Sequence, residues 1–138
     1  MTIVVLDTTT LISALGWKHG NPRKVFDLCV HDKYKLIESL DLIKEFILVI
    51  NRPKFDFISV EYKNEFLLSF LQICDLVEPK EKLKVVKPDP KDDIVLECAL
   101  AGKSNYIISG DKHLLDLKDF RGIKILTPKD FLSLIDKE

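Results

Sequence analysis

The sequence predicts an α/β fold, a three-layer α/β/α sandwich with a central and mostly parallel sheet. Short apolar runs such as Ile3–Leu6 and Tyr106–Ile108 are rich in β-branched residues and lack polar alternation. Such runs are typical of strands buried on both faces of a parallel sheet. Segments with helical periodicity separate these runs along the chain, and this alternation favours a parallel sheet covered by helices.

Length and composition restrict the classes of protein. The 138 residues, 46% of them hydrophobic, are enough for one domain with a proper core, and we expect a single domain over residues 1–138. Lys and Arg number 21 and Asp and Glu 22, so no global basic field marks a nucleic-acid binder, although local basic residues can still bind one. Because no long apolar stretch or signal segment is recognisable, we expect no membrane association and a cytoplasmic location.

Apolar periodicity and capping residues divide the chain into strands and helices. Pro22 and Pro128 each suit the first turn of a helix, and Ser39 and Ser59 are preferred helix N-caps. The expected elements are, in chain order, strand 3–6, a helix through 11–15, loop 16–22, a helix to 30, strand 35–37 ending at Glu38, helix 40–50, linker 55–57, a helix from 59 to 74, extended pieces at 76–77 and 85–86 around a turn at 79–82, helix 92–101, strand 106–108, a helical turn at 114–117, strand 123–126 and a helix to 135.

Three further expectations concern the faces and ends of helices, and the cysteines. Residues 40–50 are apolar on nearly every side, which predicts a largely buried helix. Asp89 before Pro90 is expected to cap helix 92–101, and Gly102 to occupy the C′ position at its end. The cysteines lie in apolar helical contexts without metal-ligand spacing and are expected to be reduced thiols: Cys29, Cys74 and Cys98.

Two aspartates lie where predicted strands end. Asp7 follows the strand 3–6, and Asp111 follows the strand 106–108 after Ser109 and Gly110. In open α/β sheets, ligands bind just outside the carboxyl ends of the strands, so both carboxylates are site candidates. Each aspartate alone can equally be explained as the N-cap of the following helix, but two of them together favour a shared site.

Two further carboxylates are expected to reach the same site. Glu45 lies at the centre of an apolar helix, where an unpaired carboxylate is costly unless it meets a cation, a metal or water. The alternative is a position at the rim of the core. Asp92 shares its helix face with core residues, whereas Asp93 and Glu97, four residues apart, are expected on a solvated face. A favourable interaction with the helix dipole competes as the explanation of Asp92.

A group of carboxylates without Cys or His partners suits a hard cation, Mg²⁺ or Mn²⁺, and not zinc. Such sites typically catalyse the attack of activated water on a phosphodiester. Cationic or polar residues near the expected site are candidate substrate contacts, although solvated charge is the alternative for each of them: Arg52, Lys54, Lys91, Lys112 and His113.

Four motifs carry a family resemblance that spans residue 4 to about residue 132. They are Leu6-Asp7-Thr8 followed by Leu11-Ile12-Ser13-Ala14-Leu15, Glu45 ahead of Arg52-Pro53-Lys54-Phe55, Asp89-Pro90-x-Asp92-Asp93, and Ile107-Ile108-Ser109-Gly110-Asp111. In this order and spacing they resemble the PIN-domain family, in particular the prokaryotic toxin components of toxin–antitoxin systems that are similar to VapC.

The resemblance implies the three-layer fold and a Mg²⁺- or Mn²⁺-dependent endoribonuclease that cleaves single-stranded RNA as the toxin of a type II toxin–antitoxin system. It also implies an antitoxin partner and a homodimer. The acidic residues that it implies as catalytic metal ligands are Asp7, Glu45, Asp92 and Asp111. The residues expected to support these ligands with hydrogen bonds are Thr8, Thr9, Ser109 and Asp93.

Two departures from the family pattern motivate a second hypothesis. Thr9 stands where the family commonly has asparagine, and His113 stands where many relatives carry a further acid. A threonine hydroxyl can still donate to a carboxylate or to metal-bound water. The alternative function is a catalytically weakened module that binds a protein or RNA without cleaving it. A phosphorylated receiver domain is disfavoured, because no lysine follows a late strand in the required place.

Overall fold

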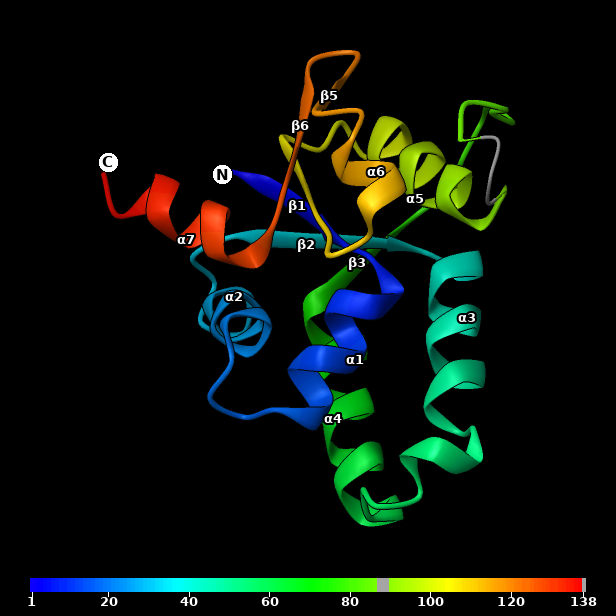
Figure 1. Ribbon diagram of the computed structural model, residues 1–138, viewed down its shortest axis with the longest axis vertical. Coiled ribbons are helices and arrows are strands. Elements are labelled where there is room, and N and C mark those ends of the chain that lie inside the picture. The colour runs from blue at the N-terminus through cyan, green and yellow to red at the C-terminus, as the bar shows by residue number, and fades with distance from the viewer. Residues whose placement is uncertain (87–89, 138) are drawn as a thin grey trace.

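A six-stranded sheet forms the middle layer of the protein, as a computed structural model describing residues 1–86 and 90–137 shows (Figure 1). The strands are β1 (Ile3–Leu6), β2 (Lys35–Ser39), β3 (Cys74–Val77), β4 (Tyr106–Ile108), β5 (Asp119–Phe120) and β6 (Ile123–Leu126). Their order across the sheet is β3-β2-β1-β4-β6-β5, and β5 alone pairs antiparallel. The predicted α/β class and mostly parallel sheet are therefore confirmed.

Helices follow the strands as the capping residues predict. They are α1 (Thr8–Gly16), α2 (Asn21–Val30), α3 (Leu40–Ile50), the short 3₁₀ helix η1 (Pro53–Phe55), α4 (Val60–Ile73), α5 (Pro90–Ala101), α6 (Lys112–Leu115) and α7 (Pro128–Ile135). The side chains of Ser39 and Ser59 accept hydrogen bonds from backbone amides in the first turns of α3 and α4. Over the part of the chain that the structure describes, no helix has the length and apolar character needed to cross a bilayer.

Helices cover both faces of the sheet and complete the three layers. On one face, Val4 and Leu6 pack against apolar side chains of α1, α2, α4 and α7. On the other face, Val5 packs with residues of α5 and α6, which lie above the sheet in Figure 1. Because successive side chains of a strand point to opposite faces, β1 contributes to both cores, as its unbroken apolar run predicts.

The topology reverses direction beside β1. The chain passes from β1 to β2 on one side of it, and later returns as β4 on its other side. All three strands are parallel, so their carboxyl ends meet at one edge of the sheet. In open α/β sheets such a switch point leaves a crevice between the diverging connections. Asp7 and Ser109 are the residues that immediately follow the two strands at this crevice.

The structure corrects several expectations. Helix α3 is not largely buried, because Leu40 is 53% and Leu48 is 70% exposed on the side away from the core. Residues 85–86 form no strand, and the short strand β5 was not predicted. The expected cap at Asp89 lies outside the described residues.

Gly102 ends helix α5 for a different reason than the expected one. The left-handed residue after this helix is Lys103, with φ of 53°, and not Gly102. A Cβ atom on Gly102 would lie 2.1 Å from Ile37 Cδ1 and 3.2 Å from Val77 Cγ1. The missing side chain therefore allows the end of α5 to approach strands β2 and β3 closely.

We predict that Gly102→Ala lowers the free energy of unfolding by about 1–3 kcal/mol, the usual cost of overpacking a core. Denaturant unfolding followed by circular dichroism measures this change. Gly110→Ala is the matched control, because beyond its two chain neighbours no described residue has an atom within 4 Å of the added Cβ. Its stability should stay within about 0.5 kcal/mol of the wild type. Equal stability of Gly102→Ala and wild type would contradict the close approach.

Candidate active site

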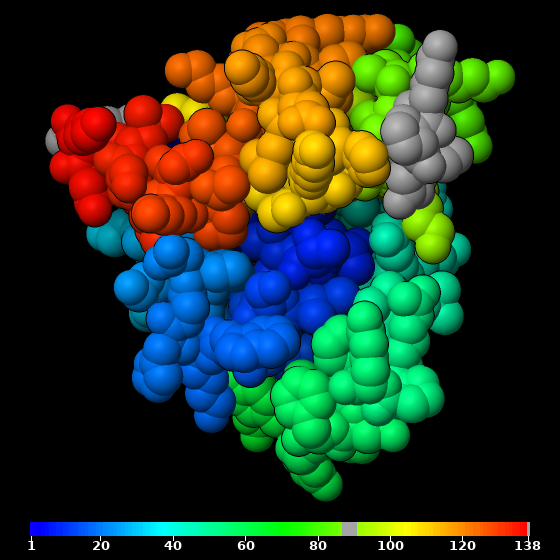
Figure 2. Space-filling view, in the orientation of Figure 1, coloured from blue at the N-terminus to red at the C-terminus, as the bar shows by residue number. Residues whose placement is uncertain are grey.

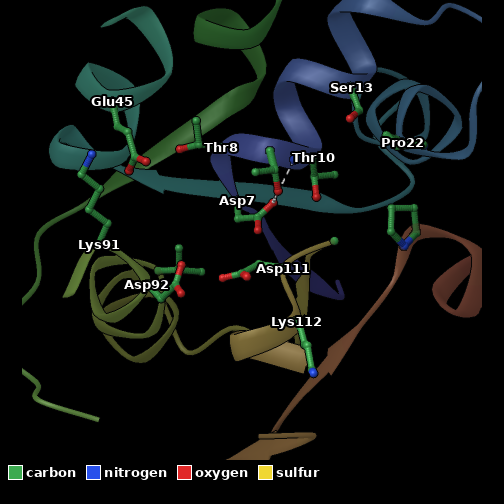
Figure 3. Close-up of a pocket in the computed structure, with 14 residues that line it drawn as sticks. Asp7, Thr8, Thr10, Ser13, Pro22, Glu45, Lys91, Asp92, Asp111 and Lys112 are labelled. Carbon is green, nitrogen blue, oxygen red and sulfur yellow. Dashed lines mark hydrogen bonds between the residues drawn. The ribbon is translucent and has the colours of Figure 1, made fainter. Parts of the chain in front are cut away.

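A pocket of about 570 Å³ opens at the carboxyl ends of β1 and β4. The four carboxylates predicted from the sequence all line it: Asp7, Glu45, Asp92 and Asp111. Figure 3 shows the side chains of Asp7, Asp92 and Asp111 pointing into one space from three different elements, with Glu45 at its margin on α3. Segments far apart in the chain thus bring their acids together, as the strand-end argument predicts.

Asp7 is the most constrained carboxylate of the pocket. It is buried, and its Oδ1 accepts hydrogen bonds from the Thr10 backbone amide at 2.9 Å and from the Thr9 hydroxyl at 3.0 Å. Its Oδ2 accepts from the Ser109 hydroxyl. Burial raises the pKa of Asp7 above its ordinary value, and these hydrogen bonds oppose the rise. Asp7 is therefore both the N-cap of α1 and a wall of the pocket, so the two explanations are compatible.

The hydroxyl of Ser109 connects the two strand ends. Ser109 is fully buried, donates to Asp7 and accepts a hydrogen bond from the Asp111 backbone amide at 2.9 Å. Asp111 in turn accepts from the His113 amide at 3.3 Å, so it also caps the short helix α6. One buried side chain thus fixes the position of Asp7 relative to the turn that carries Asp111.

Asp92 and Glu45 reach the pocket from helices. Both residues line it, and in Figure 3 the side chain of Lys91 extends toward Glu45. Asp93 lies on another face, as expected, but that face is not solvated. Asp93 is buried and accepts hydrogen bonds from the Val85 and Val86 amides at 3.0 and 2.9 Å. Its carboxylate therefore holds the segment before α5 and does not line the pocket.

Glu97 has a similar structural role, one turn further along α5. Its Oε2 accepts a hydrogen bond from the Leu83 amide at 2.8 Å. Asp93 and Glu97 thus satisfy backbone amides of a segment without regular secondary structure. The expectation of a solvated face was wrong because the partners of Asp93 and Glu97 lie outside the helix, where helical periodicity gives no information.

Glu38 is a fifth carboxylate, and the sequence argument missed it. It lies near the end of β2, is fully buried, and neither of its oxygens has a hydrogen-bond partner among the described residues. Burial raises the pKa of Glu38 well above its usual value, and the negative charge of Asp7 raises it further. The available signal was an acid that interrupts an apolar strand at its carboxyl end, as at Asp7.

Comparison with known proteins identifies the family. A family model described as PIN domain matches residues 3–113, which is most of the chain. The chain belongs to the PIN-domain family. The resemblance drawn from the sequence motifs is thus confirmed, and the matched region includes all four pocket carboxylates.

Two proteins show how far the likeness of this PIN domain extends. The uncharacterized protein MJ1680 of Methanocaldococcus jannaschii is 29% identical over 144 residues, covering 97% of this chain and 92% of the relative. The crystal structure of VapBC2 from Rickettsia felis bound to a DNA fragment from their promoter contains a chain with a TM-score of 0.61 and 13% identity. That match covers 90% of this PIN domain and 97% of the other chain, and it supports the same fold.

The residues of this PIN domain suit a hard divalent cation. Among the described residues, the pocket is lined by the carboxylates of Asp and Glu and by no His or Cys side chain. The buried Thr8 hydroxyl at its wall has no hydrogen-bond partner within the described residues. No set of three or more His, Cys, Asp or Glu residues in 1–86 and 90–137 is arranged to hold an ion directly. Mg²⁺ typically keeps several waters and takes only one or two carboxylates, so oxygen donors of this kind fit it.

The remaining predicted residues are distributed between two surfaces. Those that line the acid pocket are Thr8, Thr9, Lys91 and Lys112, whereas Ser109 is buried and hydrogen-bonded to Asp7. Arg52 and Lys54 line a neighbouring groove instead. His113 is exposed and does not line the acid pocket, although its backbone amide binds Asp111.

The cysteines are free thiols, as predicted. Burial raises the pKa of Cys29 to about 12 and that of Cys74 to about 11, and it also raises the pKa of Cys98. Cys29 and Cys98 are buried in the core and Cys74 is partly buried, and a raised pKa keeps each thiol out of the reactive thiolate form near neutral pH.

We predict that Glu38→Gln makes the stability of the protein less dependent on pH. Because the pKa of Glu38 is raised in the folded state, its stabilising proton is present below the unfolded value of 4.5 and is lost as the pH rises through the folded pKa. Between about pH 5 and pH 8 the stability of wild type should therefore fall relative to that of the variant, which has no proton to lose at this position. Urea unfolding between about pH 5 and pH 8 measures this difference.

The exposed Glu65 provides the control for this experiment. Glu65→Gln should follow the wild-type dependence on pH throughout the range. A Glu38→Gln protein whose stability falls with rising pH as steeply as that of wild type would show that Glu38 does not carry the effect.

Proposed function

We propose that this PIN domain is a Mg²⁺- or Mn²⁺-dependent endoribonuclease that cleaves single-stranded RNA. The observation that carries the proposal is the pocket at the β1/β4 switch point, into which the fold directs four carboxylates. Membership of the PIN-domain family supports nuclease chemistry. A pocket with hard oxygen donors and cationic side chains at its margin suits a phosphodiester substrate.

The residues have distinct roles in this proposal. Asp7, Asp92 and Asp111 hold the cation, directly or through water, and Glu45 orients the attacking water. Thr9 and Ser109 fix the orientation of the Asp7 carboxylate through the hydrogen bonds that they donate to it. When bound, the cation stabilises charge on the phosphodiester and lowers the pKa of coordinated water.

Cationic side chains complete the arrangement at the entrance. Lys91 and Lys112 line the pocket together with the acids. Their charge favours the approach of a phosphate to a site that would otherwise repel it. Lys112 follows Asp111 directly at the start of α6, so it is held beside the proposed ligand.

We also infer that the protein is the toxin component of a type II toxin–antitoxin system, with an antitoxin as partner. The supporting observation is the structural likeness, over 90% of this chain, to one chain of the VapBC2 structure. The expected homodimer stays a prediction.

A second candidate function is a module that binds RNA or a protein without cleaving. It is favoured by the lack, within the described residues, of three side chains arranged to hold an ion directly. The Thr9 hydroxyl nevertheless donates to Asp7 Oδ1 at 3.0 Å, so the departure from asparagine still provides a hydrogen bond to the carboxylate. This contact favours the active enzyme over the weakened module.

We predict that Asp7→Asn lowers the rate of Mn²⁺-dependent RNA cleavage by at least about 100-fold, because the amide carries no charge for the cation. Gel analysis of a labelled single-stranded RNA, with Mn²⁺ and with EDTA, measures the rate. The exposed Asp136→Asn serves as the control and should cleave like wild type. Equal rates for Asp7→Asn and wild type would contradict the assigned site. A wild type that binds Mn²⁺ but cleaves no RNA would favour the binding module.

A further inference from the structure

A second groove, of about 620 Å³, continues the acid pocket along the end of α1. The two hollows share five lining residues: Thr8, Thr9, Ser13, Glu45 and Lys91. In Figure 2 the blue surface of the N-terminal segment is recessed between the yellow segment near α6 and the green segment around η1. An extended ligand whose reacting group lies in the acid pocket would therefore run directly into this groove.

Exposed aromatic rings line the far end of the groove. Trp17, at the end of α1, is 56% exposed, and Phe57, between η1 and α4, is 67% exposed. Their ring centroids lie 6.5 Å apart in an edge arrangement, and the buried Phe55 lies 6.4 Å from Phe57. The two exposed rings come from different segments, so the fold brings them together at one surface without burying them.

Cationic side chains line the same groove. Arg52, Lys54 and Lys91 line the groove, and the Lys54 Nζ lies 5.1 Å from the centroid of the Phe55 ring. The acid that lines the groove is Glu45, on the side shared with the acid pocket. The charge therefore changes from acidic at the proposed reaction centre to basic beside the aromatic rings.

We propose that this aromatic groove, defined by Trp17, Phe57, Arg52 and Lys54, binds unpaired bases of the RNA strand next to the scissile phosphate. The proposal rests on the proposed function. Proteins that bind single strands combine aromatic side chains, on which bases stack, with cations that contact the phosphates. Only unpaired bases can stack in this way, so the groove would select single-stranded over double-stranded RNA.

An apolar segment of a partner protein is the competing occupant of an aromatic groove. Arg52 and Lys54 at its edge favour a polyanion, because an apolar segment would offer their positive charges no complementary group. The direct continuity with the acid pocket also favours the substrate, since the strand on one side of the cleaved bond must leave the pocket somewhere.

Trp17 allows a direct test, because it is the single tryptophan of the chain. Wild type in EDTA is titrated with a labelled single-stranded RNA of about eight nucleotides, within the usual range of such sites. Tryptophan fluorescence reports stacking on Trp17, and anisotropy of the label reports affinity. A duplex of the same sequence is titrated in parallel.

We expect single-stranded RNA to quench Trp17 and duplex RNA to leave its fluorescence unchanged. Trp17→Ala and Phe57→Ala should each weaken binding by about tenfold, the usual effect of removing one stacking partner. Arg52→Ala should also weaken binding and reduce its dependence on salt. Leu68→Ala, an exposed residue of α4, and Lys33→Ala, an exposed residue before β2, are the controls and should bind like wild type.

RNA binding without quenching, at an affinity that neither aromatic variant changes, would overturn the proposal. Quenching by the duplex as strong as by the single strand would also overturn it, as would failure of RNA to bind at all. The cleavage assay separates this outcome from failure of the proposed function. If wild type and Phe57→Ala cleave RNA equally well, the proposed nuclease function still holds. The groove would then be assigned to binding a partner protein and not RNA.

Discussion

The hydrogen bonds around the buried Asp7 carboxylate are the constraint on which the site depends. Asp7 directly follows the central strand β1, caps α1 by accepting a hydrogen bond from the Thr10 amide, and accepts another from the Ser109 hydroxyl at the neighbouring strand end. Ser109 also binds the Asp111 amide, so the same contacts place both strand-end acids. The pocket is thus built from interactions that also begin two helices, and this explains why each aspartate resembles an ordinary cap when it is considered alone.

The concentration of acids has an electrostatic cost that shapes the chemistry. Asp7 is buried, and the charge of Asp7 raises the pKa of Glu38 on the adjacent strand. Burial and like charge both disfavour ionised carboxylates, and a divalent cation reverses that preference for the acids that it contacts. Cation binding and the proposed reaction therefore both depend on this concentration of carboxylates. The basic groove beside the pocket offsets the electrostatic repulsion that the carboxylates would exert on an RNA strand.

Most of the fold and part of the site could be predicted from the sequence. Apolar runs and periodicity located the strands, and parallel topology then placed Asp7 and Asp111 at one edge of the sheet. The helix face of Asp92 distinguished it from its neighbour. The burial of Asp93 and the close approach at Gly102 were not predictable, because their partners lie on segments with no sequence periodicity in common with them. Local sequence patterns specify helices and strands, whereas tertiary contacts determine the hydrogen-bond partners of each polar side chain.

A titration of Mn²⁺ followed by electron paramagnetic resonance tests the central claim most directly, because it detects the cation without requiring the correct RNA. The proposed site predicts that wild type binds Mn²⁺ and that Asp111→Asn weakens this affinity by at least about tenfold, as loss of a charged ligand does. Circular dichroism establishes that the variant is folded. Equal Mn²⁺ affinity of the folded Asp111→Asn protein and wild type would contradict the claim that the strand-end acids form a metal-dependent active site.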